Sequence, residues 1–141
     1  MIIKIYCDGG CVPNPGQMYG SYAIEMNGQE IISNTEDYDF GTNNVAEFTS
    51  LHRALLKTSD LLDVINKPPG DCRLYIYTDS TVIRNRLMGS RRRNKAKTMS
   101  KNEGRKRMAY WTEKCWVLLC VYKHWEAKWQ SRELNVQRFG H

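Results

Sequence analysis

The chain has 141 residues, 41% of them hydrophobic and 26% charged, a composition that is typical of a globular protein and excludes a disordered one. No apolar run approaches the roughly 20 residues that span a bilayer, and no leader-like segment precedes the first apolar run, so we expect a soluble, cytoplasmic protein without a membrane partner. The five cysteines are odd in number and lack a CxxC pair, which argues against a zinc site and a disulfide framework.

The net charge of +6 is concentrated in one segment. Between Arg84 and Arg107 lie 11 of the 21 basic residues and one of the 15 acidic residues, which gives this segment a charge of +10 and the rest of the chain −4. A concentrated basic segment on a mildly acidic protein favours a polyanionic partner that binds at one place, although a solvated loop is the simpler alternative. The densest part of the segment contains Arg91, Arg92, Arg93, Lys95 and Lys97.

The first part of the chain predicts a three-stranded antiparallel meander. The first apolar run ends at Asp8, and the glycines and prolines of residues 9–16 predict a turn. Strands are expected over residues 19–26 and 31–38, joined by Asn27-Gly28, which is a strong two-residue hairpin signal.

A helix is expected next, because apolar residues recur at helical spacing from Val45 to Leu55. It should begin near Thr42 or Asn43, both acceptable caps, and end before the breaker at residues 66–70.

The second half of the chain predicts two further strands and two further helices. In order, these are a strand over residues 74–77, a helix over 80–88, a basic stretch without clear periodicity over 90–106, a helix over 108–122, a strand over 125–129 and a short tail. A strand, a crossover helix and a strand in succession favour parallel pairing. We therefore expect an α/β fold with a mixed five-stranded sheet, three antiparallel strands followed by parallel strands, and helices on both faces. Residues 1–141 should form one domain with a basic insertion at about 84–107.

Three acids occupy unusual positions in this pattern. Asp8 and Asp79 each end a buried strand, and Glu47 lies within an amphipathic helix. Burying a carboxylate costs several kcal/mol unless something pairs with it. Each acid alone is explained as a helix cap, a loop acid or a solvated helix residue. The ends of neighbouring strands and a covering helix can bring all three together, and Mg²⁺ and Mn²⁺ prefer such carboxylate ligands.

These acids lie in motifs that resemble the ribonuclease H type 1 family. The motifs are Asp8-Gly9-Gly10-Cys11 with Asn14-Pro15-Gly16, then Thr42-Asn43-Asn44-Val45-Ala46-Glu47, then Thr78-Asp79-Ser80. They follow the family's order and approximate spacing, and the resemblance covers nearly the whole chain. It implies an RNase H-like fold. It also implies an endoribonuclease that hydrolyses the RNA strand of RNA–DNA hybrids by a two-metal-ion mechanism with Mg²⁺, or Mn²⁺ as a substitute, and leaves a 3′-hydroxyl.

The resemblance also implies roles for individual residues. The metal-binding, catalytic acids match Asp8, Glu47 and Asp79. Contacts to the minor groove of the hybrid, where 2′-hydroxyls distinguish RNA from DNA, match Cys11, Asn14, Asn43 and Asn44, and a contact near the DNA backbone matches Thr42. Contacts to phosphate or sugar are expected from Ser80 and Thr81, and the basic segment is expected to bind the hybrid through Arg91, Arg92, Arg93, Lys95 and Lys97.

The chain departs from the family after the fifth strand, where a fourth acid is usual. The last carboxylate is Glu133, and the run Arg132-Glu133-Leu134-Asn135 admits two registers. One register puts Phe139 at the fourth position and leaves no ligand there. The other uses Asn135, which we favour as a catalytic metal ligand because an amide oxygen can bind a metal and a phenyl ring cannot. Neither His124 nor His141 matches the family's helper histidine well, and both are interpreted as surface or structural residues.

Two other functions fit these residues. A non-catalytic module that binds RNA–DNA hybrids or duplex RNA would keep the fold and lose the chemistry with the fourth acid. A transposase or resolvase core would use the same acids, but it would not need the asparagines at the helix start to detect a 2′-hydroxyl. We expect a monomer with no obligate protein partner.

Overall fold

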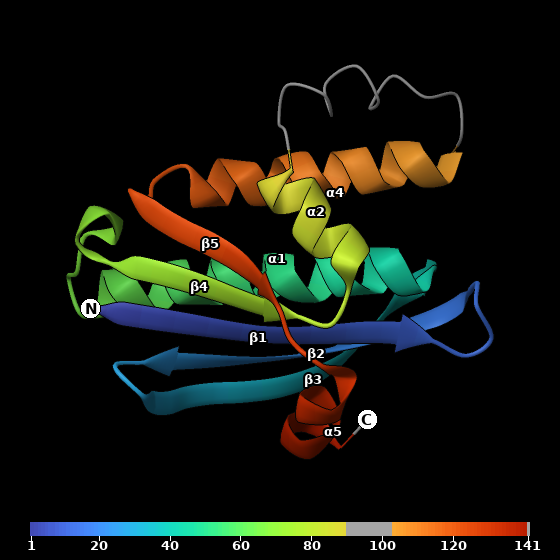
Figure 1. Cartoon of the computed structure of the whole chain (residues 1–141), viewed down its shortest axis with the longest axis horizontal. Coiled ribbons are helices and arrows are strands. Elements are labelled where there is room, and N and C mark those ends of the chain that lie inside the picture. The colour runs from blue at the N-terminus through green and yellow to red at the C-terminus, as the bar shows by residue number, and fades with distance from the viewer. Residues whose placement is uncertain (90–102, 141) are drawn as a thin grey trace.

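The computed structural model describes residues 1–89 and 103–140, except for the side chains of 103–105. Its strands form one sheet in the order β3-β2-β1-β4-β5 (Figure 1). The strands are β1 (Ile2–Cys11), β2 (Gly16–Met26), β3 (Gln29–Gly41), β4 (Arg73–Thr78) and β5 (His124–Trp129). The helices are α1 (Asn43–Val64), the short 3₁₀ turn η1 (Pro69–Asp71), α2 (Thr81–Met88), α4 (Glu103–Leu119) and α5 (Arg132–Phe139).

Strand pairing confirms the expected mixed sheet. β2 is antiparallel to both β1 and β3, and it turns into β3 at Asn27-Gly28, where both residues have positive φ. β4 is parallel to β1, and β5 is parallel to β4. The carboxyl ends of β1, β4 and β5 therefore meet at one end of the sheet, which is where the acids lie.

Helices cover both faces of the sheet. Alternate residues of β1 point to opposite faces, and Ile3, Ile5 and Cys7 are fully buried on the face where α1 packs, with α4 packed on α1. Tyr6 points to the other face, where the guanidinium of Arg138 on α5 lies 3.6 Å from the centre of its ring. In Figure 1, α5 lies on the side of the sheet away from α2 and α4.

Two sequence-based boundaries were wrong at the acid end of the sheet. The predicted turn over residues 9–16 is confined to residues 12–15, because β1 continues through Gly9 and Gly10, which pair with Gly20 and Tyr19 of β2. The predicted tail contains α5. Of its residues only Asn135 is buried, so this helix has no apolar periodicity to reveal it.

Helices take up both ends of the basic segment that was expected to be an insertion at about 84–107. Arg84 and Arg86 belong to α2, and α4 begins at Glu103, before the expected residue 108. The dense basic residues Arg91, Arg92, Arg93, Lys95 and Lys97 lie outside the described residues. Among the helices that the structure describes, none combines the length and apolar character needed to cross a bilayer.

Candidate active site

Asp8 and Asp79 become neighbours through the parallel pairing of β1 and β4. Tyr6 of β1 pairs with Tyr77 of β4, and two residues further along each chain segment Asp8 lies beside Asp79, which directly follows the last residue of β4. Helix α2 is then capped by Ser80, whose hydroxyl accepts a hydrogen bond from the backbone N–H of the third residue on at 3.2 Å. The end of the strand and the helix cap thus fix the Asp79 backbone from both sides.

Glu47 reaches these acids because α1 lies very close to β1 at Gly9. A Cβ atom on Gly9 would lie only 2.5 Å from the backbone carbonyl carbon of Ala46, so a side chain at this position would push the helix away. Thr42 caps the helix, accepting from the backbone N–H of Val45 at 3.4 Å. The sequence expectation for the start of this helix is thereby confirmed.

The environment of Glu47 is unfavourable for a lone negative charge. Glu47 is 4% exposed, and its Oε2 accepts a hydrogen bond from the Thr78 hydroxyl at 3.2 Å. Oε1 is buried and has no hydrogen-bond partner among the described residues. Burial, followed by repulsion from Asp79 and Asp8, raises the pKa of Glu47 well above its usual value.

The three acids share one cavity of about 340 Å³. We call it the acid cavity, and it is lined by Asp8, Gly9, Gly10, Cys11, Val12, Tyr19, Asn43, Asn44, Glu47, Asp79, Ser80 and Arg132. One carboxylate oxygen of each acid lies within 4.8 Å of the others. Hard oxygen donors in this arrangement suit Mg²⁺ or Mn²⁺, and a cation would satisfy the orphaned Oε1 and offset the mutual repulsion. The residues present therefore fit a divalent metal.

Four of the expected substrate-binding residues line the acid cavity with the acids: Cys11, Asn43, Asn44 and Ser80. The Asn43 side chain accepts from the Cys11 backbone N–H at 2.9 Å, which ties the start of α1 to the end of β1. Asn44, the next residue, is exposed and also lines the cavity.

Asn14 and Thr81 lie outside the cavity lining. Asn14 is exposed, and its amide oxygen accepts from the Cys11 thiol at 3.4 Å and from the Asn43 backbone N–H at 3.3 Å. Thr42, the cap of α1, is half-buried and likewise outside the lining. Thr81 is the exposed first residue of α2. The structure thus places Asn14 and Thr42 at the start of α1, next to residues of the cavity.

Asn135 is fully buried on α5 and is not among the residues that line the acid cavity. Its Oδ1 accepts from Nε2 of Gln130 at 2.6 Å, while its Nδ2 is buried without a partner among the described residues. Its role as a fourth ligand stays a prediction. Glu133 is exposed on the same helix, and Phe139 is half-buried at its end.

Sequence reasoning missed Arg132 as a lining residue. It is the first residue of α5, three positions after the end of β5, and its exposed side chain brings a positive charge to the acid cavity. The signal was available, because residues that follow adjacent parallel strands meet at one end of a sheet. His124 begins β5 at the opposite end of the sheet and is exposed, and His141 lies outside the described residues.

The fold and the acid cavity together define an α/β domain with a carboxylate site suited to a divalent cation. The model of the RNase H family matches residues 2–130. The chain belongs to the RNase H family, whose members depend on divalent metal ions. A ribonuclease H of Acidiphilium cryptum (strain JF-5) is 32% identical over 91 residues, which make up 60% of this chain and 46% of the relative, so the match spans less than half of that protein.

Solved structures share the fold at lower sequence identity. RNase H1 from the archaeon Halobacterium salinarum NRC-1 has a TM-score of 0.73 at 19% identity, with 96% of this chain and 89% of that chain covered. LC11-RNase H1 in complex with an RNA/DNA hybrid has a TM-score of 0.72 at 22% identity, with the same coverage of 96% and 89%.

Proposed function

We propose that this chain is a type 1 ribonuclease H, an endoribonuclease that hydrolyses the RNA strand of RNA–DNA hybrids. The observation that carries the proposal is the convergence of Asp8, Glu47 and Asp79 in one cavity, together with a buried Glu47 oxygen that no described residue hydrogen-bonds. A relative named Ribonuclease H and the hybrid complex of LC11-RNase H1 support the substrate class.

The three acids would hold two divalent ions, Mg²⁺ or, as a substitute, Mn²⁺, with Asn135 as a neutral fourth ligand. When bound, such ions activate a water for in-line attack on the phosphate and stabilise the leaving oxygen. Thr78 contributes by orienting Glu47 through its hydroxyl. Arg132, which lines the same cavity, supplies a positive charge to the phosphate.

Substrate discrimination is assigned to the rim of the acid cavity. Amide groups of Asn14, Asn43 and Asn44 can donate to and accept from 2′-hydroxyls, which only the RNA strand carries. Ser80 and Thr81 at the start of α2 contact phosphate or sugar. The basic residues between Arg84 and Arg107 bind the backbone of the hybrid outside the cavity. Residues 1–141 act as one monomeric domain in the cytoplasm.

A non-catalytic hybrid-binding or duplex-RNA-binding module is the second candidate. The observation that favours it concerns Asn135, the residue proposed as the fourth ligand. Asn135 carries no charge, and its side-chain oxygen already accepts a hydrogen bond from Gln130. A site with one fewer carboxylate binds cations more weakly.

A substrate panel distinguishes the candidates. The parent is incubated with end-labelled RNA–DNA hybrid, duplex RNA, duplex DNA and single-stranded RNA in Mg²⁺, in Mn²⁺ and in EDTA. The proposal predicts internal cleavage of the RNA strand of the hybrid alone, and only with divalent metal. Binding of the hybrid without cleavage in either metal would favour the module, and cleavage of duplex DNA would favour a transposase-like or resolvase-like enzyme.

A further inference from the structure

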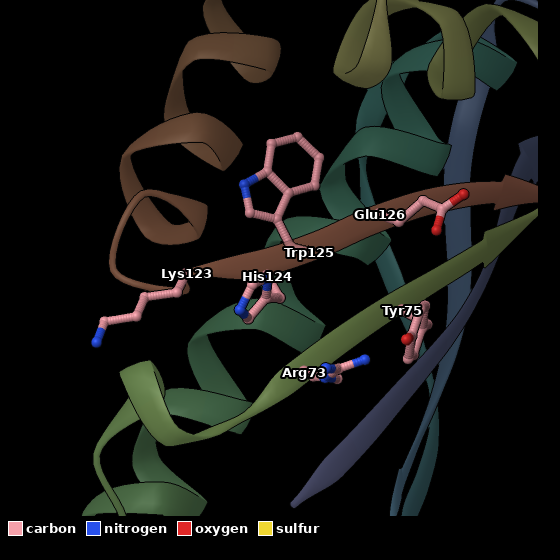
Figure 2. Close-up of a pocket in the computed structure, with 6 residues that line it drawn as sticks. All are labelled: Arg73, Tyr75, Lys123, His124, Trp125 and Glu126. Carbon is pink, nitrogen blue, oxygen red and sulfur yellow. The ribbon is translucent and has the colours of Figure 1, made fainter.

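A second cavity of about 340 Å³ lies at the opposite end of β4 from the acids. We call it the sheet-end pocket, and it is lined by Arg73, Tyr75, Lys123, His124, Trp125 and Glu126. Figure 2 shows Arg73 and Tyr75 on β4 beside His124 at the start of β5, with Lys123 in the turn just before it. The parallel register pairs Arg73 with His124, which brings Arg73 of β4 next to the turn that carries Lys123.

The two cations of the sheet-end pocket form no ion pair within the described part of the chain. The ion pairs recorded there both involve Arg138, and neither Arg73 nor Lys123 takes part in one. Both side chains are exposed, and Glu126 is the single acid of the lining. Unpaired cations around a cavity, with one acid against them, favour an anionic ligand.

An aromatic surface adjoins these cations. Tyr75 is half-buried on β4, and the Lys128 ammonium lies 4.8 Å from the centre of its ring, which adds a further positive charge beside the pocket. Trp125 pairs with Leu74 and points to the opposite face of the sheet, where it packs against the core, so Tyr75 is the aromatic ring on the face of Arg73 (Figure 2). Cations beside an aromatic ring on a sheet are features that bind single-stranded nucleic acid, through its phosphates and its base faces.

We propose that the sheet-end pocket binds a nucleic-acid strand, as a second contact separate from the acid cavity. The choice of nucleic acid over an acidic protein rests on the proposed function, which brings such a polymer to this molecule. β4 has six residues, so Arg73 and Asp79 lie roughly 20 Å apart at about 3.3 Å per residue. At about 3.4 Å per nucleotide along a duplex strand, an extension of about six nucleotides spans this distance.

The test is direct binding of fluorescent oligothymidylate of about 15 nucleotides, in EDTA, followed by anisotropy across a salt series. The variant is Arg73→Gln/Lys123→Gln. The matched control is Arg53→Gln/Lys57→Gln, which removes the same charge from α1, outside both cavities. Removing two cations that neutralise phosphates should lower the slope of log affinity against log salt by about 1.4 and weaken binding by about 25-fold at 0.1 M salt, with the control near the parent.

Two results would overturn the proposal. One is equal weakening by both variants, or by neither, since then the pocket has no specific part in binding. The other is displacement of the oligonucleotide by polyglutamate of equal charge as efficiently as by unlabelled oligothymidylate. Because the ligand is DNA and metal is absent, this result is independent of catalysis. A parent that fails to cut hybrid contradicts the proposed function alone.

Discussion

Glu47 occupies a position where a negative charge is costly without a cation. Its pKa is raised by burial and by the two aspartates that face it, so between about pH 4.5, its usual pKa, and the raised value the folded chain holds a proton that the unfolded chain has lost. The contribution of this group to stability is therefore complete below the usual pKa and is lost as the pH rises toward the raised value.

This linkage predicts the behaviour of Glu47→Gln without metal. In EDTA the parent should lose stability from pH 5 to pH 8 relative to the variant, because Glu47 has to give up its proton as the pH rises and glutamine carries no titratable proton. Urea unfolding at both pH values measures the difference. Excess Mg²⁺ should stabilise the parent at pH 8 and leave the variant nearly unchanged. If the free energy of unfolding changes with pH in the same way for both proteins, the pKa of Glu47 is not raised in the folded chain.

The proposed role of Asn135 as a metal ligand is tested by substitutions that change the charge at this position. Asn135→Asp keeps an acceptor for Gln130 and adds a carboxylate, so the Mg²⁺ concentration for half-maximal hybrid cleavage should fall by about tenfold, since cation affinity rises with ligand charge. Asn135→Ala should raise that concentration. Glu133→Gln, on the exposed side of the same helix, serves as the control and should match the parent. If Asn135→Ala follows the parental Mg²⁺ curve, Asn135 is not a ligand.

At the scale of the elements, the contact between β1 and α1 positions the site. Gly9→Ala should force α1 away from β1, because the added Cβ meets the backbone of Ala46 rather than a movable side chain. We expect destabilisation of about 1–3 kcal/mol and a larger loss of cleavage, since Glu47 moves relative to Asp8. Gly70→Ala is the matched control, because its Cβ would make an ordinary contact at 3.6 Å. Equal effects in both variants would exclude a positioning role for Gly9.

Element types were predictable where apolar periodicity was strong, and elements without it were missed. The strands, α1 and its cap at Thr42 follow from alternating or helical patterns and from turn residues. α5 could not be predicted, because its exposed surface carries no pattern and its place is set by contacts such as that of Arg138 with Glu25 at 3.3 Å. Arg132, the first residue of this helix, could still have been placed near the acids, because it closely follows β5 and the ends of adjacent parallel strands meet.

Among the site residues, the acids could be predicted because carboxylates at strand ends are chemically unusual. Their convergence depended on a register that no local pattern reveals, namely the pairing of Tyr6 with Tyr77, which is far away in the sequence. The orphaned Oε1 of Glu47 likewise exists only in the folded structure.

At the scale of the whole molecule, the charges are unevenly distributed. Asp8, Glu47 and Asp79 lie in one cavity, whereas 11 of the 21 basic residues lie between Arg84 and Arg107. Replacing Arg91, Arg92, Arg93, Lys95 and Lys97 by Gln should weaken hybrid binding and lower its salt slope by about 0.9 for each phosphate that these side chains neutralise in the parent. The rate of cleavage at saturating hybrid should change little. An unchanged salt slope would mean that this segment does not bind the hybrid.

The central claim is that Asp8, Glu47 and Asp79 form one metal-dependent centre that cuts the RNA of a hybrid. Single-turnover cleavage of a labelled hybrid across Mg²⁺ and Mn²⁺ titrations, by the parent and by Asp8→Asn, tests this claim most directly. We predict no cleavage in EDTA, metal-dependent cleavage of the RNA strand by the parent, and a loss of at least about 10³-fold, roughly 4 kcal/mol of transition-state stabilisation, in a folded Asp8→Asn variant. Cleavage that persists in EDTA, or that proceeds at the parental rate in Asp8→Asn, would contradict it.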